Sequence, residues 1–271
     1  MKNIFKVEWL KIKNYPAFWW VMIMTILSYP GVNLIFWKIF LNITKKKDQT
    51  GQIVAWLLGN PFAFPDTFHT TAYFSSFFVF IPSILVIMLI TNEFTYKTNR
   101  QNIIDGWSRD TFLWGKFINV LLTTLIVTLL YSLVAIIIGY AATTKMPDNP
   151  MKEIRFIGLF ALQSFEQLSI AFLFGFIVRR SFLALSLFLF YYLIVENTIV
   201  KILSLKTNDL GRFLPLEIAD RLIPIPGFLG KFDEDAFKIG IAAIPIHIFY
   251  SLFMSIIIWI VCFQVNKKRD I

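Results

Sequence analysis

Three ionisable side chains, Glu166, Glu196 and His247, fall inside long apolar runs of the sequence. Charge at membrane depth is costly, so such residues face the interior of a helix bundle and often mark a transport pathway. If the surrounding runs are helical, Glu166 and His247 lie at similar depths and can meet. The alternative is an interhelical hydrogen-bond clasp, which Gln163 and Gln167 would extend. Glu166→Gln separates the two, because lost transport in a well-folded protein would contradict a purely structural clasp.

No catalytic motif accompanies these residues. The phosphate-binding pattern G-x-x-x-x-G-K-[ST] is missing, because Phe117 follows Gly115-Lys116 and Asp110 stands where the first glycine is required. The protease pattern H-E-x-x-H and the hydrolase pattern G-x-S-x-G are also absent. Two His and one Cys do not suffice for a metal site built from those residue types. We therefore expect no catalytic residues, and no cofactor or metal site in this chain.

The composition indicates an integral membrane protein. Hydrophobic residues make up 57% of the 271 residues and charged residues 16%, whereas soluble domains carry about 25% charged residues. The formal net charge is +9. In an apolar chain this excess is better explained by Lys and Arg facing anionic lipid headgroups than by nucleic-acid binding.

Six apolar runs are long enough to cross a bilayer as helices, which takes about 20 residues each. They are about 17–38, 70–91, 117–142, 156–178, 182–200 and 240–263. Transmembrane β-barrels show short alternating segments instead, so we expect an all-α membrane protein with one transmembrane domain over residues 1–271. Pro30, Pro82 and Pro245 should bend their helices. The spacing of Ala171 and Gly175 favours close packing of that span against another helix of the same subunit.

The segments outside these runs have distinct patterns. Residues 1–16 place apolar side chains on one face and lysines around the rest, which is typical of an amphipathic helix at the membrane interface. The stretch 222–229 (LIPIPGFL) is too short to cross and too apolar for a free loop. We expect it to re-enter the membrane between spans 5 and 6, the alternative being a surface loop with a few packed apolar residues.

Lys and Arg favour a cytoplasmic N-terminus and C-terminus. With the N-terminus inside, the inner segments 1–16, 92–116, 179–181 and 264–271 hold 13 of the 26 Lys and Arg residues in about fifty positions. The longer outer segments hold the rest together with ten Asp and Glu. Lys45-Lys46-Lys47 opposes this orientation, but the density difference favours it.

The inner segment 92–116, which we call the elbow, has recognisable helix signals. A short helix is expected from about Glu93 to Ile104, ending at Gly106, a residue suited to a left-handed C-terminal position. Ser108 can cap the next helix. Ile103, Ile104 and Trp107 would then form an exposed apolar tip, the alternative being a plain polar connector.

The elbow resembles the loop between spans 2 and 3 of type-2 ABC exporter permeases. The resemblance rests on N-E-F-T-Y-K-T-N-R (92–100), G-W-S-R (106–109) and F-x-x-x-K (112–116), and the layout of six spans agrees over the whole chain. The resemblance implies that this loop contains a cytoplasmic coupling helix. It also implies that coupling to the ATPase depends on the apolar tip and on five polar residues, Glu93, Thr98, Arg100, Ser108 and Arg109. Lys97 stands where the family usually has glycine.

The resemblance further implies a permease subunit that pairs with an identical or related permease. Separate cytoplasmic ATPase subunits would bind ATP and Mg²⁺ and drive export of an amphiphilic cargo, such as a peptide antibiotic, a lipid-like compound or a drug, across a bacterial-type plasma (inner) membrane. The alternative is an ion-conducting, ion-extruding or sensory membrane protein whose elbow binds another cytoplasmic partner. A neighbouring gene for a P-loop ATPase would favour the exporter.

Overall fold

The computed structural model describes residues 10, 13–44, 56, 58–206 and 209–268, and no strand occurs among them. The long elements are α2 (Pro16–Thr44), α4 (Thr67–Ser76), α5 (Phe80–Thr95), α7 (Arg109–Ala142), α8 (Arg155–Val178), α9 (Ser181–Phe190), α10 (Glu196–Lys206) and α13 (Glu234–Lys268). The shorter ones are α6 (Thr98–Ile104), the π-turn η1 (Tyr191–Val195), the 3₁₀ turn η2 (Leu210–Phe213), α11 (Pro215–Asp220) and α12 (Gly227–Gly230). The predicted interfacial helix 1–16 lies largely outside the described residues.

Five helical segments are long and apolar enough to cross a membrane, and the bent pair α4 and α5 brings the total to as many as six. The all-α prediction is thereby confirmed. The bent pair turns by 50° at its break instead of forming one continuous helix. Most spans exceed their predicted bounds, because polar residues beyond the apolar window continue the helix. The longest extensions are in α7, which begins at Arg109, and in α13, which runs from Glu234 to Lys268.

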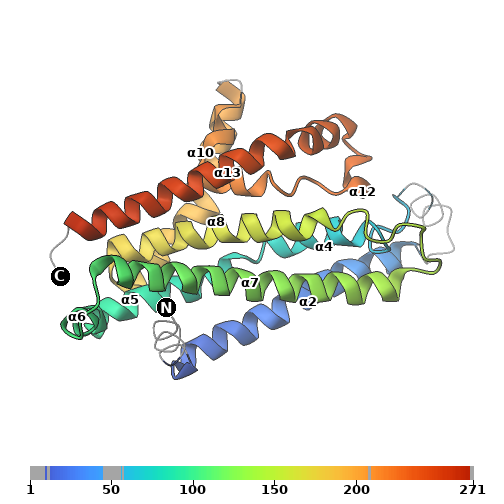
Figure 1. The fold of residues 1–271 in the computed structure, drawn as a ribbon. Coiled ribbons are helices and arrows are strands. Elements are labelled where there is room, and N and C mark those ends of the chain that lie inside the picture. The colour runs from blue at the N-terminus through green and yellow to red at the C-terminus, as the bar shows by residue number, and fades with distance from the viewer. Residues whose placement is uncertain (1–9, 11–12, 45–55, 57, 207–208, 269–271) are drawn as a thin grey trace.

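Helix α8 lies at the centre of the bundle and contacts α4, α5, α7, α9, α11 and α13 (Figure 1). A Cβ atom added at Gly175 would lie 2.5 Å from Ile90 and 3.3 Å from the Ile87 backbone, so α8 and α5 approach as closely as glycine allows. The predicted close packing at Ala171 and Gly175 therefore occurs within the chain.

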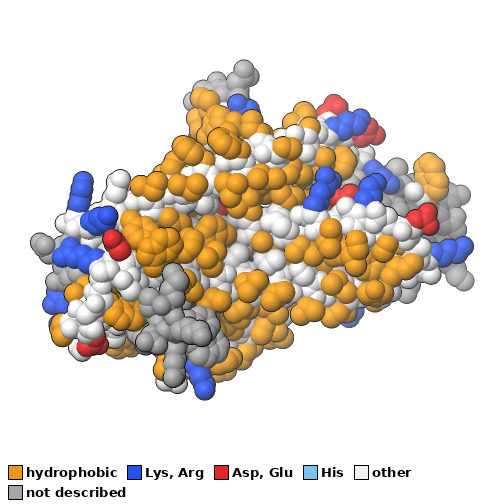
Figure 2. Space-filling model, viewed as in Figure 1, with side chains coloured by type: hydrophobic (Ala, Val, Ile, Leu, Met, Phe, Trp, Pro, Cys, Tyr) orange, Lys and Arg blue, Asp and Glu red, His pale blue; other side chains and the backbone are white. Residues whose placement is uncertain are grey.

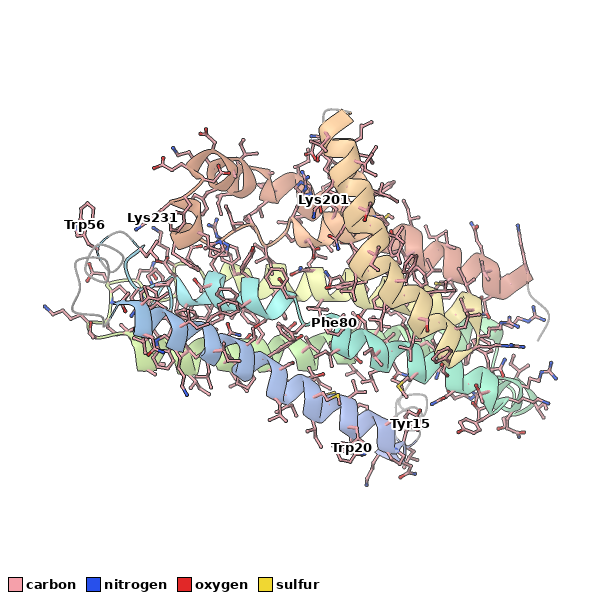
Figure 3. The ribbon with its side chains drawn as sticks, turned by 180° about the vertical axis from the view of Figure 1, so that it is seen from behind. Tyr15, Trp20, Trp56, Phe80, Lys201 and Lys231 are labelled. Carbon is pink, nitrogen blue, oxygen red and sulfur yellow. The ribbon has the colours of Figure 1, made fainter. Side chains whose placement is uncertain are left out.

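The α9–α10 span diverges from the rest of the bundle, and α10 projects away from it near Lys201 (Figure 3). Only 17% of its apolar window is buried, against 61% for α8. The π-turn Tyr191–Val195 interrupts this span one residue before Glu196. The divergence leaves a large apolar face for lipid or another protein.

Candidate functional site

Glu93 and Lys116 form a buried ion pair that anchors the elbow. The Lys116 Nζ lies 2.6 Å from Glu93 Oε1, and the two side chains are 4% and 5% exposed respectively. The Thr98 hydroxyl donates a hydrogen bond to the other oxygen of Glu93. One carboxylate therefore joins the end of α5, the start of α6 and the second turn of α7.

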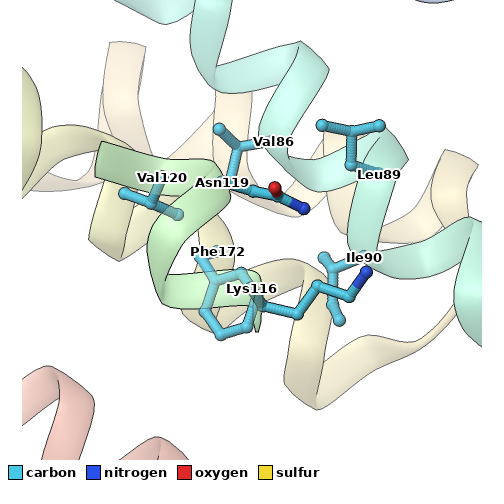
Figure 4. Close-up of a pocket in the computed structure, with 7 residues that line it drawn as sticks. All are labelled: Val86, Leu89, Ile90, Lys116, Asn119, Val120 and Phe172. Carbon is cyan, nitrogen blue, oxygen red and sulfur yellow. The ribbon is translucent and has the colours of Figure 1, made fainter. Parts of the chain in front are cut away.

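The Lys116 side chain extends from α7 into a narrow cavity between α5, α7 and α8 (Figure 4). Ile90, Asn119 and Phe172 are among the residues that line this cavity, and the ammonium also lies 5.4 Å from the ring centre of Phe112. The cation therefore meets the carboxylate in largely apolar surroundings, where breaking the pair would leave an uncompensated charge.

The predicted helix from Glu93 to Ile104 is wrong at its start. Helix α5 continues to Thr95, and α6 begins only at Thr98. The break occurs at Lys97, which has a left-handed backbone with φ of 54°. A residue with a Cβ atom enters this region at a cost of about 1–2 kcal/mol. The position therefore requires the conformation that glycine adopts freely.

The far end of the elbow follows the predicted turn chemistry. Gly106 has φ of 94°, and the Ser108 hydroxyl accepts a hydrogen bond from the Thr111 backbone at 3.0 Å. Ile104 is 77% exposed, whereas Ile103 and Trp107 are half-buried. Arg100 is also exposed, and Lys and Arg side chains gather at this end of the molecule (Figure 2).

The elbow is also attached to the last helix. The Arg109 guanidinium donates to the backbone oxygen of Lys267 at 3.2 Å, and the Asn266 amide donates to the backbone oxygen of Arg109 at 2.9 Å. Thr91 of α5 and Ser181 of α9 share a hydrogen bond of 2.7 Å. The ends of four spans therefore meet beside the elbow.

Glu166 and His247 are both buried, but no hydrogen bond joins them in the described part of the chain. The Ser251 hydroxyl donates to Glu166 Oε2 at 2.5 Å and so links α13 to α8. The other oxygen of Glu166 and Nδ1 of His247 have no hydrogen-bond partner among the described residues. The Glu166 contact has the geometry of a clasp, and the two orphaned atoms leave part of the hydrogen-bonding capacity of Glu166 and His247 unused.

Glu196 and the two glutamines hold the segment between α10 and α13. Glu196 Oε1 accepts from the backbone N–H groups of Leu216 at 2.6 Å and Glu217 at 2.8 Å. The amides of Gln163 and Gln167 donate to Asp220 at 3.0 and 2.8 Å. Two spans thereby fix α11 through buried polar contacts.

The apolar stretch 222–229 packs partly inside the molecule. Leu222 and Ile223 are buried, and His69 of α4 contacts the Pro224 backbone oxygen at 2.8 Å through Nε2. Nearby, the Arg221 guanidinium bridges both oxygens of Asp209 at 2.7 Å, and these hydrogen bonds lower the pKa of Asp209. The stretch is therefore tied to α4 instead of forming a free loop.

Sequence reasoning missed Ser251, Asn266 and Asp220. Serine and asparagine carry no local signal for a partner some eighty or more residues away. Glu217 and Arg221, by contrast, show the i,i+4 spacing of a helical ion pair, and they lie 2.6 Å apart in the structure. That spacing indicates a helical turn just before the apolar stretch, and Asp220 belongs to it.

The helices that are long and apolar enough to cross a membrane define an integral membrane protein. A model of the ABC-2 family transporter proteins matches residues 4–195, and the chain belongs to this family. Membership implies association with an ATP-binding-cassette partner. No curated protein matches the chain.

Proposed function

We propose that the chain is the permease subunit of an ATP-driven exporter, in which the elbow docks on a separate cytoplasmic ATPase. The observation that carries this proposal is the joint at Glu93, Lys116 and Thr98. A buried ion pair and a hydroxyl connect the elbow to two spans, while Ile104 projects outward at 77% exposure. A rigidly held helix with an apolar tip suits the transmission of force from a docked partner.

In this mechanism, ATP closes the ATPase dimer and moves both elbows as rigid bodies. ATP favours one arrangement of the two permeases because the closed ATPase dimer fits that arrangement better. The contacts of Arg109 with Lys267 and of Asn266 with Arg109 would carry the same displacement to α13. ATP and Mg²⁺ bind only in the partner.

The exposed α9–α10 span supports pairing with a second permease, identical or related, or contact with lipid. We place the elbow and both termini in the cytoplasm, which puts α12 at the outer side of a bacterial-type plasma membrane. The cargo would be amphiphilic. The stretch 222–229 would act as a re-entrant element, which its buried residues Leu222 and Ile223 and the contact of His69 with the Pro224 backbone support.

The test is co-purification of the tagged chain with its partners, followed by measurement of ATP hydrolysis. We expect a P-loop ATPase to co-purify, and Ile104→Asp to weaken its retention about tenfold or more, because charging an anchor at an interface centre commonly costs at least about 2 kcal/mol. The matched control is Phe232→Asp, which charges a side chain 70% exposed at the opposite end of the bundle. Equal loss in both variants, or in neither, would contradict docking at the elbow.

A further inference from the structure

A pocket of about 200 Å³ opens where the α9–α10 span diverges from the bundle. Three carboxylates reach it: Glu196 from α10, and Glu217 and Asp220 from α11. Phe77, at the break between α4 and α5, and Tyr192 of the π-turn add aromatic rings to the lining. The pocket therefore combines acidic groups with an aromatic, largely apolar setting.

No Lys or Arg is among the described residues that line this pocket. Arg221 is the nearby cation, and its guanidinium is already shared between Asp209 at 2.7 Å and Glu217 at 2.6 Å. Neither Glu196 nor Asp220 forms a salt bridge with any residue that the structure describes. The buried carboxylate of Glu196 is therefore left without a cation among the described residues, whereas that of Asp220 is exposed at the pocket and open to water.

Hydrogen-bond acceptors also outnumber donors here. Glu196 is 2% exposed, and its Oε2 has no hydrogen-bond partner in the described ranges. The Tyr191 hydroxyl lies near this carboxylate but outside hydrogen-bonding geometry. The side-chain oxygens of Gln163 and Gln167 are also buried and orphaned, since their amide groups point to Asp220. Of these atoms, Glu196 Oε2 belongs to a residue that lines the pocket, and an N–H donor bound there would satisfy it.

We propose that this pocket binds the positively charged end of an amphiphile, namely an ammonium or guanidinium group on an apolar body. Such a head supplies both the missing charge and the missing donors, and the rings of Phe77 and Tyr192 favour a cation over their faces. The apolar body would lie against the exposed side chains of Phe77 and Leu193, which are 54% and 57% exposed. The proposed binding rests on the export function proposed above, and it narrows the exported cargo from amphiphiles in general to cationic amphiphiles.

The experiment uses the full chain in detergent with one reactive thiol placed in the pocket. Asn197, which lines the pocket, is changed to Cys, and the buried Cys262 is changed to Ala. Labelling of Asn197→Cys by N-ethylmaleimide is then timed with increasing phenethylammonium. The matched probes are 2-phenylethanol, which is neutral, and 3-phenylpropionate, which is anionic. Only the ammonium should slow labelling.

Two substitutions remove the charge but keep the structural contacts. Glu196→Gln and Asp220→Asn each retain an oxygen that accepts the hydrogen bonds seen in the structure. In the combined variant, half-protection should require about tenfold more phenethylammonium, which corresponds to about 1.4 kcal/mol. The control Glu234→Gln removes an exposed carboxylate at the start of α13 and should leave protection unchanged.

Equal protection by 2-phenylethanol, or full protection in the combined variant, would overturn the proposal and leave only an apolar pocket with neutral carboxyl groups. The readout needs no ATPase. A chain that binds the ammonium but retains no ATPase would contradict the export function alone. A chain that couples to an ATPase but shows no charge-dependent protection would contradict the cationic cargo alone.

Discussion

The polar groups at the elbow and those around the α9–α10 pocket differ in how far neighbouring groups compensate their charge and satisfy their hydrogen bonds. At the elbow, the carboxylate of Glu93 meets the ammonium of Lys116 and the hydroxyl of Thr98. At the pocket, Glu196 has an oxygen without a hydrogen-bond partner among the described residues, and neither Glu196 nor the more exposed Asp220 forms a salt bridge with a described residue. A buried carboxylate that is paired with a cation and a donor holds neighbouring segments together. A buried carboxylate that lacks such partners and lies beside a cavity can instead bind a ligand.

The largest effect should come from unbalancing the joint. Lys116→Met leaves Glu93 buried without its cation, and we expect a loss of about 3–5 kcal/mol in the free energy of unfolding. Glu93→Gln should be costly for the same reason. Both substitutions together should cost less than the sum, because the double variant buries no unpaired charge. Denaturant titration in detergent measures all three variants, and strictly additive losses would show that the two side chains do not act as a pair.

A smaller effect is expected at the glutamines that hold α11. Gln163→Leu with Gln167→Leu removes both amide donors to Asp220. Because Asp220 is exposed and water can replace these donors, we expect a loss of about 0.5–1.5 kcal/mol for each hydrogen bond. Hydrogen exchange of residues 215–230 should quicken. The control is Gln101→Leu, which breaks an exposed amide–carboxylate contact with Asp105 on α6 and should change stability by less than about 0.5 kcal/mol. Unchanged exchange at 215–230 would mean that the glutamines do not hold this segment.

The smallest effect concerns the backbone of the elbow at Lys97. Lys97→Gly relieves the left-handed strain at φ of 54° but adds freedom to the unfolded chain, so we expect a gain of at most about 1 kcal/mol. Lys97→Val introduces a β-branched side chain at the same backbone position and should destabilise the protein. Thermal unfolding of the two variants gives the comparison, and the reverse order of stability would contradict the left-handed geometry.

Several features follow from local sequence alone. The long, continuously apolar runs predict helical spans because a membrane-spanning helix satisfies its own backbone hydrogen bonds in lipid, whereas the other solution, a closed β-barrel, shows short alternating segments. Gly106 and Ser108 predict the turn and the helix cap at the elbow, since each acts through its own backbone neighbourhood. Pro82 predicts a bend in span 70–91, and this span bends by 50° between α4 and α5, directly before the first turn of α5 in which Pro82 lies.

Partner choice among the polar residues required the assembled bundle. Glu166 was paired with His247 by depth, yet its hydrogen bond comes from Ser251, one turn further along α13. Depth alone does not fix the rotation of one helix about its axis relative to another. That rotation is set by packing, such as the close approach at Gly175.

The sequence by itself determined that this chain crosses the membrane as helices, contains no phosphate-binding loop and has a capped polar elbow, because those properties depend on composition and on neighbours a few residues away. Only the tertiary structure decided that Lys116 balances Glu93, whereas Glu196 and Asp220 face a pocket whose described lining contains no Lys or Arg. The physical reason is that the energy of a buried charge depends on which groups are brought within a few ångströms of it, and the folding of distant segments sets that distance.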